Sequence, residues 1–299
     1  MILDHGKADL SGLSMSLETL ASKQNPDGGW PYVRGCSWTE PTVYAILALL
    51  AGGEHQAANR GLGWLQAAQR PDGGWPPQKG VEESTWVTAL AALLPADVLG
   101  AKPHARAIHW LVGVSGEETT FSYRLREFLL GNAIPPELAH AGWPWIPGAA
   151  AWVGPTSVAL LALGMEYRRA PTAAIGGRLE GGRKFLLARM CREGGWNHGS
   201  VRALGYESAP YPETTGMALA ALHGVSSPQV DRSLTVAKGF LSQCRSADAL
   251  NWLRLGLMAH GQLPPDYSPP SGVCYRTCPE VSLDAVVTAH ADGRGQLWG

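Results

Sequence analysis

The sequence predicts an all-α protein, an α/α toroid in which outer and inner helices alternate around a closed ring. The first observation is a recurrent turn, which reads QNPDGGW at residues 24–30 and QRPDGGW at 69–75. The second is that each turn lies between an amphipathic stretch and a stretch that is apolar nearly all round, both at helical spacing. Strand-like alternation of apolar and polar residues is hardly visible along the chain.

Further copies of the turn extend the repeat beyond the first hundred residues. CREGGWN at 191–197 keeps the Gly-Gly-Trp core, and GWPW at 142–145 is a degenerate copy. Repeats of this kind are the first feature to establish, because each unit needs neighbours to bury its apolar face. The strongest repeats cover residues 10–95 and 177–224.

The helical stretches on the two sides of the turns have different environments. A helix that is apolar on every face is buried on every face, so these helices form the inner ring. The amphipathic stretches lie outside, with their charged sides in water. The amphipathic stretches are 13–23, 60–69, 103–113, 182–190 and 229–243, and the candidate inner stretches are 39–53, 82–94, 119–131, 154–164, 213–224, 247–260 and 279–291.

These stretches make about six outer/inner pairs, enough for an α6/α6 barrel around a central cavity. An open solenoid of stacked pairs is the alternative. Closure is favoured because the apolar inner helices need neighbours on both sides. No linker is long enough to divide the chain, so we expect one domain over residues 1–299.

The composition argues against several classes of protein. Lys and Arg number 24 against 25 Asp and Glu, a net charge of −1 that argues against a nucleic-acid partner. No apolar run is long enough to span a bilayer, and the N-terminus does not read as a signal peptide, so we expect a cytoplasmic protein. Five cysteines do not suggest a disulfide framework. Peripheral contact with a membrane is compatible with this composition.

The turn motif resembles a known repeat. Gln24 with Gly28-Gly29-Trp30, and Gln69 with Gly73-Gly74-Trp75, are similar to the glutamine–tryptophan (QW) repeat of squalene–hopene-type terpenoid cyclases. More loosely, they are similar to the protein prenyltransferase β subunits. The resemblance implies an α6/α6 toroid with a cavity for an isoprenoid, in a divergent single-domain member of that superfamily.

The same comparison excludes an ordinary triterpene cyclase. The family's acid motif, Asp-x-Asp-Asp, is absent, because no two aspartates lie within three positions of each other. For the same reason no Asp-rich cluster could hold a diphosphate through magnesium, and the chain is too short for the second barrel of the full-length enzymes. The resemblance therefore implies a relative with altered chemistry, or with none.

Eight of the 12 tryptophans fall into two groups. Trp30, Trp75 and Trp196 belong to the turns and Trp64 to an outer helix, and all four are expected to be structural, with the indole N–H satisfied. A second group lies at or just inside the starts of inner helices. Its members either line an aromatic cavity that suits a polyprenyl chain and a carbocation, or fill the core. They are Trp38, Trp86, Trp152 and Trp252, with Tyr44 and Tyr211 nearby.

One set of carboxylates is the candidate for catalysis. Alignment of the inner helices places Glu40, Glu83 and Glu213 at the same position in the first turn. Capping of the helix N-terminus is the simpler interpretation. The sharper one is that these carboxylates share one rim of an apolar cavity, raise each other's pKa and supply a general acid. The threonines two residues later, Thr42, Thr85, Thr156 and Thr215, are expected to bond back to the backbone.

The remaining polar candidates carry weaker signals. His198 follows a turn and either lines the cavity or is a satisfied core residue. Arg124 and Arg254 hold an anionic group if they point inward, and otherwise belong to a solvated face. Cys274, Cys278 and His290 are the only plausible zinc ligands, but their spacing favours ordinary thiols in a Pro-rich loop. We expect no metal and no cofactor.

Three functions fit these observations. The first is an enzyme, an atypical cyclase, isomerase or prenyl-transfer-like protein, that acts on an apolar isoprenoid in the cavity. The second is a non-catalytic toroid that binds an apolar ligand or a protein. The third is a carbohydrate-active α/α barrel, because paired carboxylates and cavity tryptophans also suit sugars. The spacing of the repeat favours the first.

Overall fold

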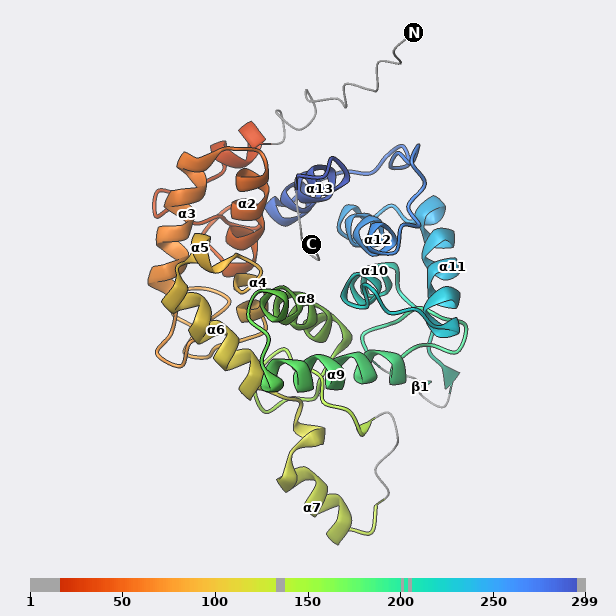
Figure 1. Ribbon diagram of the computed structural model, residues 1–299. Helices are drawn as coiled ribbons and strands as arrows, with labels where there is room; N and C mark the ends of the chain where they lie inside the picture. Colours follow the sequence, from red (N-terminus) through yellow and green to blue (C-terminus); the bar gives the residue numbers. More distant parts are fainter. Residues whose placement is uncertain (1–16, 133–137, 200–201, 204–205, 295–299) are drawn as a thin grey trace.

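The chain folds as a closed ring of inner helices surrounded by outer helices, an α/α toroid. The computed structural model describes residues 17–132, 138–199, 202–203 and 206–294. Each inner helix packs against the next, and the last packs against the first, so the ring closes. Figure 1 looks down this ring. The inner helices are α2 (Thr39–Ala51), α4 (Val87–Ala91), α8 (Val153–Arg169), α10 (Pro212–Ala221), α12 (Ala247–Ala259) and α13 (Cys278–Ala291).

The outer layer covers the ring from outside. A helical segment at residues 17–22 precedes the first inner helix. Shorter elements fill the connections, among them one antiparallel hairpin. The outer helices are α3 (His55–Ala68), α6 (Ala101–Gly113), α9 (Ala173–Ala188) and α11 (Pro228–Gln243), and the short elements are α5 (Ala96–Leu99), the 3-10 helix Glu117–Thr119, α7 (Phe121–Leu129), β1 (Arg202–Ala203) and β2 (Tyr206–Glu207).

The turn tryptophans join the helical segment 17–22 and the outer helices α3, α6 and α9 to the inner helices that follow them. In the first copy, the buried indole N–H of Trp30 donates to the carbonyl of Leu20, and its backbone N–H donates to Thr42 Oγ1 at 2.9 Å. Both bonds recur in the other copies, including the degenerate one, so the sequence interpretation of these tryptophans as structural is supported. The tryptophan–threonine pairs are Trp30–Thr42, Trp75–Thr88, Trp143–Thr156 and Trp196–Thr215.

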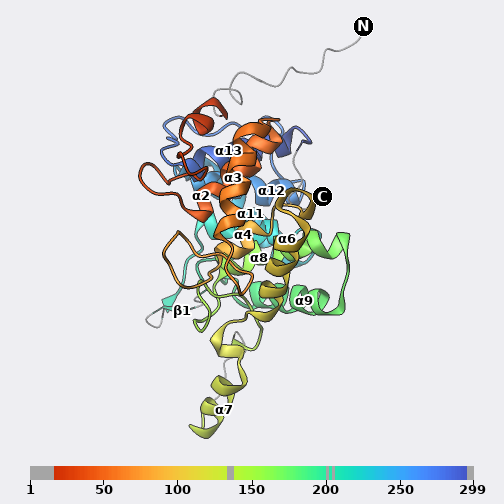
Figure 2. The ribbon, with the colours of Figure 1, turned by 90° about the vertical axis from the view of Figure 1, so that its left-hand side faces the viewer.

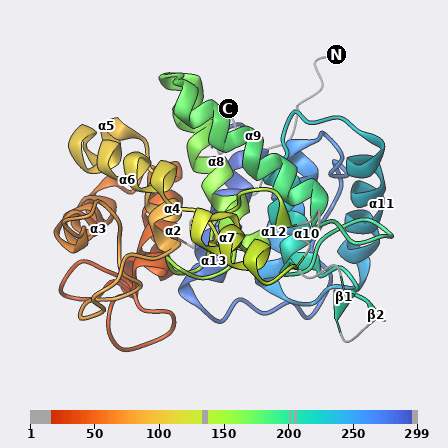
Figure 3. The same cartoon turned by 90° about the horizontal axis from the view of Figure 1, so that it is seen from below.

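The loops interlock around one face of the ring, where Figure 3 shows the connections before α2, α4, α10 and α13. Near the start of an inner helix, a backbone N–H donates to the loop that carries the next tryptophan. Cys278 of α13 donates in this way to the carbonyl of Tyr32 at 2.7 Å and completes the ring. The other three bonds run from Thr39 to Pro77, from Trp86 to Trp145 and from Val153 to His198.

Two glycines bring α10 and α12 unusually close. A Cβ on Gly216 would lie 2.3 Å from the carbonyl carbon of Trp252, and a Cβ on Gly256 would lie 2.5 Å from the carbonyl oxygen of Gly216. Only glycine leaves room for this backbone contact. The close approach places the first turns of the two helices, with Glu213 and Asp248, beside each other.

The structure corrects two details of the predicted ring. The stretch 119–131 is not an inner helix: it forms α7, which has no buried residue and projects from the body. Its apolar residues face water instead of a neighbouring helix. The sixth inner place is taken by α13, and in the described chain an extended segment, not an outer helix, precedes it. No helix of the described ranges is long and apolar enough to cross a membrane.

Candidate functional site

A cavity of about 330 Å³ opens where the inner helices begin. Four inner helices contribute to it, together with Trp86 just before α4, and three residues come from the loops that carry the turn tryptophans. Its lining is rich in carboxyl and aromatic groups. The lining residues are Tyr32, Glu40, Tyr44, Trp86, Trp145, Gly154, His198, Glu213, Thr214, Met217, Asp248 and Trp252.

Two positions of the repeat supply most of this lining. The first lies two residues before the threonine that accepts from the turn tryptophan. The second lies two residues after that tryptophan. The repeat therefore fixes the backbone at both positions while the side chain varies from copy to copy. The first position holds Glu40, Trp86, Gly154 and Glu213, and the second holds Tyr32, Trp145 and His198 in the lining and Pro77 outside it.

Three carboxyl groups meet in the cavity. Glu40, Glu213 and Asp248 are each the second residue of their helix, on α2, α10 and α12. Tyr32 donates a hydrogen bond to Glu40 Oε2. Within the described residues no hydrogen bond reaches the Asp248 carboxyl, so this group is available to a ligand in the cavity.

Burial and the charges of neighbouring carboxylates raise the pKa of two of these groups, Asp248 and Glu40. The pKa of Asp248 rises from 3.8 to about 7, first because burial penalises the charged form and then because of the charges of Glu213 and Glu40. Burial also raises the pKa of Glu40, although the hydrogen bond from Tyr32 opposes the rise. The free N–H groups of the helix ends favour the ionised form, but they do not outweigh burial for Asp248. A neutral carboxylic acid near pH 7 is a candidate proton donor.

Aromatic side chains form the other walls and the mouth. Trp86 and Trp145 meet edge to face, with ring centroids 4.7 Å apart, and Trp252 is buried behind the carboxyls. At the mouth, His198 lies between the rings of Trp152 and Tyr211, at centroid distances of 5.9 and 5.2 Å. The cavity thus combines acid groups with π faces, which attract a cation.

The structure brings together most of the residues that the sequence singled out. Glu40, Glu213, Tyr44, Trp86, Trp252 and His198 line the cavity, and Trp152 and Tyr211 flank its mouth. Trp38 does not line the cavity itself. Its ring packs edge to face on the lining residue Tyr32, with the ring centroids 5.5 Å apart.

Glu83 does not belong to this constellation, and its predicted alignment was wrong. The residue is exposed in the loop before α4. The threonine that accepts from Trp75 is Thr88, not Thr85. It lies 13 residues after the tryptophan, close to the separation of 12 in the first copy, whereas Thr85 follows too soon. Trp86 therefore occupies the place that corresponds to Glu40.

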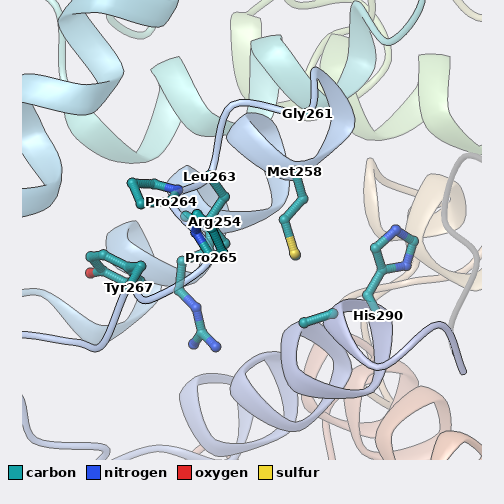
Figure 4. Close-up of a pocket in the computed structure, with 9 residues that line it drawn as sticks. Arg254, Met258, Gly261, Leu263, Pro264, Pro265, Tyr267 and His290 are labelled. Atoms are coloured by element: carbon teal, nitrogen blue, oxygen red, sulfur yellow. The ribbon is translucent and has the colours of Figure 1, made fainter. Parts of the chain in front are cut away.

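The two arginines lie elsewhere. Arg124 is exposed on α7 and donates to the carbonyl of Ala139, outside the ring. Arg254 points to the opposite end of α12, where Nη1 lies 2.6 Å from Asp284 Oδ1. It lines a separate pocket of about 590 Å³, in which Figure 4 shows Arg254 and Met258 of α12 on one side and His290 of α13 on the other.

The weak metal candidates are not assembled. Cys278 begins α13 and His290 lies near its end, twelve residues later, so the helix holds them roughly 18 Å apart. Cys274 is exposed in the preceding loop. Among the described residues no group of three or more His, Cys, Asp or Glu side chains could hold a metal ion.

Sequence reasoning missed six of the lining residues, and Tyr32, Trp145 and Asp248 are the three that matter for the chemistry. A signal for the first two was present, because both stand two residues after a turn tryptophan, as His198 does. Asp248 occupies the same helical place as Glu40 and Glu213, but no turn tryptophan precedes α12 to reveal the alignment.

Comparisons with known proteins support the fold. No family model matches the chain, and no curated protein matches its sequence. Among solved structures, the type II terpene cyclase MstE from Scytonema is similar at 18% identity and a TM-score of 0.54, over 95% of this chain and 78% of that one. A second structure of that cyclase holds its product, merosterolic acid A.

Glycoside hydrolases share the architecture as well. A GH8 endo-β-1,4-glucanase from an Achatina fulica gut metagenomic library is 14% identical, with a TM-score of 0.58, over 92% of this chain and 97% of that one. An α-amylase from Clostridium perfringens is 9% identical, with a TM-score of 0.61, over 95% and 99%. At these identities the similarity establishes the α/α toroid, which terpene cyclases and glycoside hydrolases both use.

Proposed function

We propose that this protein is an enzyme that protonates an isoprenoid and so starts its cyclisation or isomerisation. The observation that carries the proposal is the cavity itself, where three carboxyls face aromatic rings at the start of the inner helices. Asp248 is the proton donor, and Glu40 and Glu213 keep it protonated near neutral pH. The QW-like turns support an isoprenoid over other substrates.

The chemistry needs only groups that line the cavity. The Asp248 O–H bond breaks and its proton goes to one carbon of a double bond, whose π electrons form the new C–H bond. The adjacent carbon becomes a carbocation, which the carboxylates and the faces of Trp86, Trp145 and Trp252 stabilise. In the last step a C–H bond next to the cationic carbon breaks. Its electron pair forms a new C=C double bond, and its proton goes to the Asp248 carboxylate.

The size of the cavity defines what part of a substrate reacts. A volume of about 330 Å³ lies at the small end of ligand pockets, roughly 300–1,000 Å³. The reacting end of the isoprenoid occupies the cavity. The remainder of the chain lies against the side chains of Trp152, His198 and Tyr211 at the mouth.

Incubation of the purified protein with farnesyl diphosphate, geranylgeranyl diphosphate and squalene, followed by extraction and GC–MS, tests the proposal. We expect a new isomeric or cyclic product from at least one of them, and none from the Asp248→Asn variant. Asp266→Asn is the matched control, because Asp266 is an exposed carboxylate in a loop. A product that both variants form equally excludes Asp248 as the acid.

A glycoside hydrolase is the second candidate, and the constellation of carboxyls is the observation that favours it. Glycosidic hydrolysis uses one protonated and one ionised carboxyl on either side of the bond, and tryptophans stack on sugar rings. Release of reducing ends from cello- or malto-oligosaccharides, with no product from the three isoprenoids, identifies this activity instead.

A further inference from the structure

The short helix α7 exposes an apolar surface that no described part of the chain covers. Phe121, Leu125, Phe128 and Leu129 recur at helical spacing, so they share one side of the helix. Their exposed fractions are 80%, 43%, 78% and 73%, and Leu130 just beyond the helix is 66% exposed. Figures 1 and 2 both show α7 standing away from the toroid.

Charge on the same helix is biased toward the positive. Arg124 and Arg126 are both exposed. Glu127 is the only acid on α7, and its carboxylate accepts hydrogen bonds from Arg126 and Asn132. Two cations beside an apolar side of Phe and Leu residues are the composition of a helix that lies in a membrane interface.

A second copy of the chain fits this surface less well. The five apolar side chains expose on the order of 600 Å², less than the roughly 800 Å² that each partner buries in a standard interface. Pairing of two α7 helices would also bring the arginines of both copies together. An anionic lipid surface instead accommodates both the apolar side chains and the cations.

We infer that α7 is a membrane-docking element, which inserts Phe121, Leu125, Phe128 and Leu129 among the acyl chains of an anionic phospholipid surface. Arg124 and Arg126 lie at the level of the lipid phosphates. This inference does not depend on the chemistry proposed for the cavity. It gives the toroid a fixed attachment at one side of the ring.

Co-sedimentation of the full chain with lipid vesicles tests the apolar contribution. Vesicles of phosphatidylcholine mixed with phosphatidylglycerol should bind the protein, and the double variant Phe121→Ser/Phe128→Ser should lose about tenfold or more of that binding. The matched control is Val33→Ser/Tyr167→Ser, at two other exposed apolar positions on the body, which should bind like the wild type. Because all four side chains are exposed, circular dichroism and the melting temperature should not change.

A second pair of variants tests the charges. Arg124→Gln/Arg126→Gln should reduce binding to the phosphatidylglycerol vesicles about tenfold and should not affect binding to phosphatidylcholine alone. Arg34→Gln/Lys79→Gln, at exposed cations in other loops, is the control. Equal binding by the Phe variant and the wild type, or no binding by the wild type, overturns the inference. Light scattering that shows a dimer dissociated by the Phe variant also overturns it, in favour of a second copy.

Discussion

Two arcs of the inner ring face each other across the cavity and differ in chemistry on the same scaffold. In α2, α10 and α12 the second helical residue is a carboxylic acid. In α4 and α8 the corresponding position holds Trp86 and Gly154. The backbone is nevertheless held in the same way in both arcs wherever a turn tryptophan precedes the helix, by the tryptophan N–H that donates to a buried threonine.

The difference separates the residues that hold the ring from those that can react. The turn tryptophans and their threonines are buried and hydrogen-bonded to each other, and none of them lines the cavity. The side chain two residues before each threonine points to the cavity and contributes nothing to the bond. Function can therefore diverge at that position while the toroid stays intact.

The largest effect is expected at Asp248. Asp248→Asn removes the proton donor and should lower kcat by about 10²- to 10⁴-fold, the range for loss of a general acid. Steady-state kinetics on the substrate identified by GC–MS provide the measurement. KM should change little, because the amide keeps the shape of the site. Turnover that stays within a few-fold of the wild type would place the acid elsewhere.

The same residue should make stability depend on pH. Its folded pKa is about 7 against 3.8 ordinarily, so between these values the folded state binds the proton and the unfolded state does not. The wild type should therefore lose stability as pH rises from about 4 to about 7, by a few kcal/mol in total. In urea unfolding at a series of pH values, the curve of Asp248→Asn should be flatter in this window. Parallel curves for the two proteins would contradict the raised pKa.

A substitution on the scaffold side should cost stability and spare chemistry. Thr88→Val leaves the backbone N–H of buried Trp75 without its acceptor, which should destabilise the protein by about 1–3 kcal/mol. Thr235→Val, at an exposed threonine, is the control. Below the unfolding transition the Thr88 variant should keep the wild-type kcat. A large loss of kcat in the folded variant would show that the two roles are not separate.

Glu213→Gln should lower the pKa of the Asp248 carboxyl without removing this acid. Without the Glu213 charge, the pKa of Asp248 falls, so the pH at which activity is lost on the alkaline side should move lower. At pH 7 activity should fall several-fold, and it should recover in part at more acidic pH. A pH–rate profile decides this, and an unshifted alkaline limb would show that Glu213 does not act on Asp248.

The smallest effect is expected at Glu83. This carboxylate is exposed in a loop, and Trp86 holds the cavity position that the sequence alignment gave to it. Glu83→Gln should leave kcat, the pH profile and the melting temperature unchanged. A measurable loss of kcat would show that Glu83 takes part in the acid chemistry after all.

Much of this account could be predicted from the sequence, for reasons that differ by residue. Apolar periodicity and the repeated turn predicted the ring, since an inner helix such as α10 is apolar on every side. The alignment of α4 could have been found by counting from the turn tryptophan, because Thr88 lies 13 residues after Trp75, as Thr156 lies 13 residues after Trp143. The similarity between the residues around Glu83 and those around Glu40 led to the wrong alignment. The place of Asp248 beside Glu213 follows from the close packing of α10 on α12 at Gly216 and Gly256. This is a tertiary contact, which the local sequence around Asp248 does not indicate. The stretch that became α7 has helical periodicity but nothing to bury it.

The helices α2, α10 and α12 together keep the Asp248 carboxyl protonated near neutral pH in the proposed mechanism. Infrared difference spectroscopy tests this protonation without a known substrate. Spectra of the wild type minus Asp248→Asn are recorded as the pH is raised from 5 to 9. We expect a protonated-carboxyl C=O band at low pH that belongs to Asp248 and disappears around pH 7. If no such band exists at pH 5, or if it titrates near 4, Asp248 is an ordinary carboxylate and the proposed acid chemistry fails.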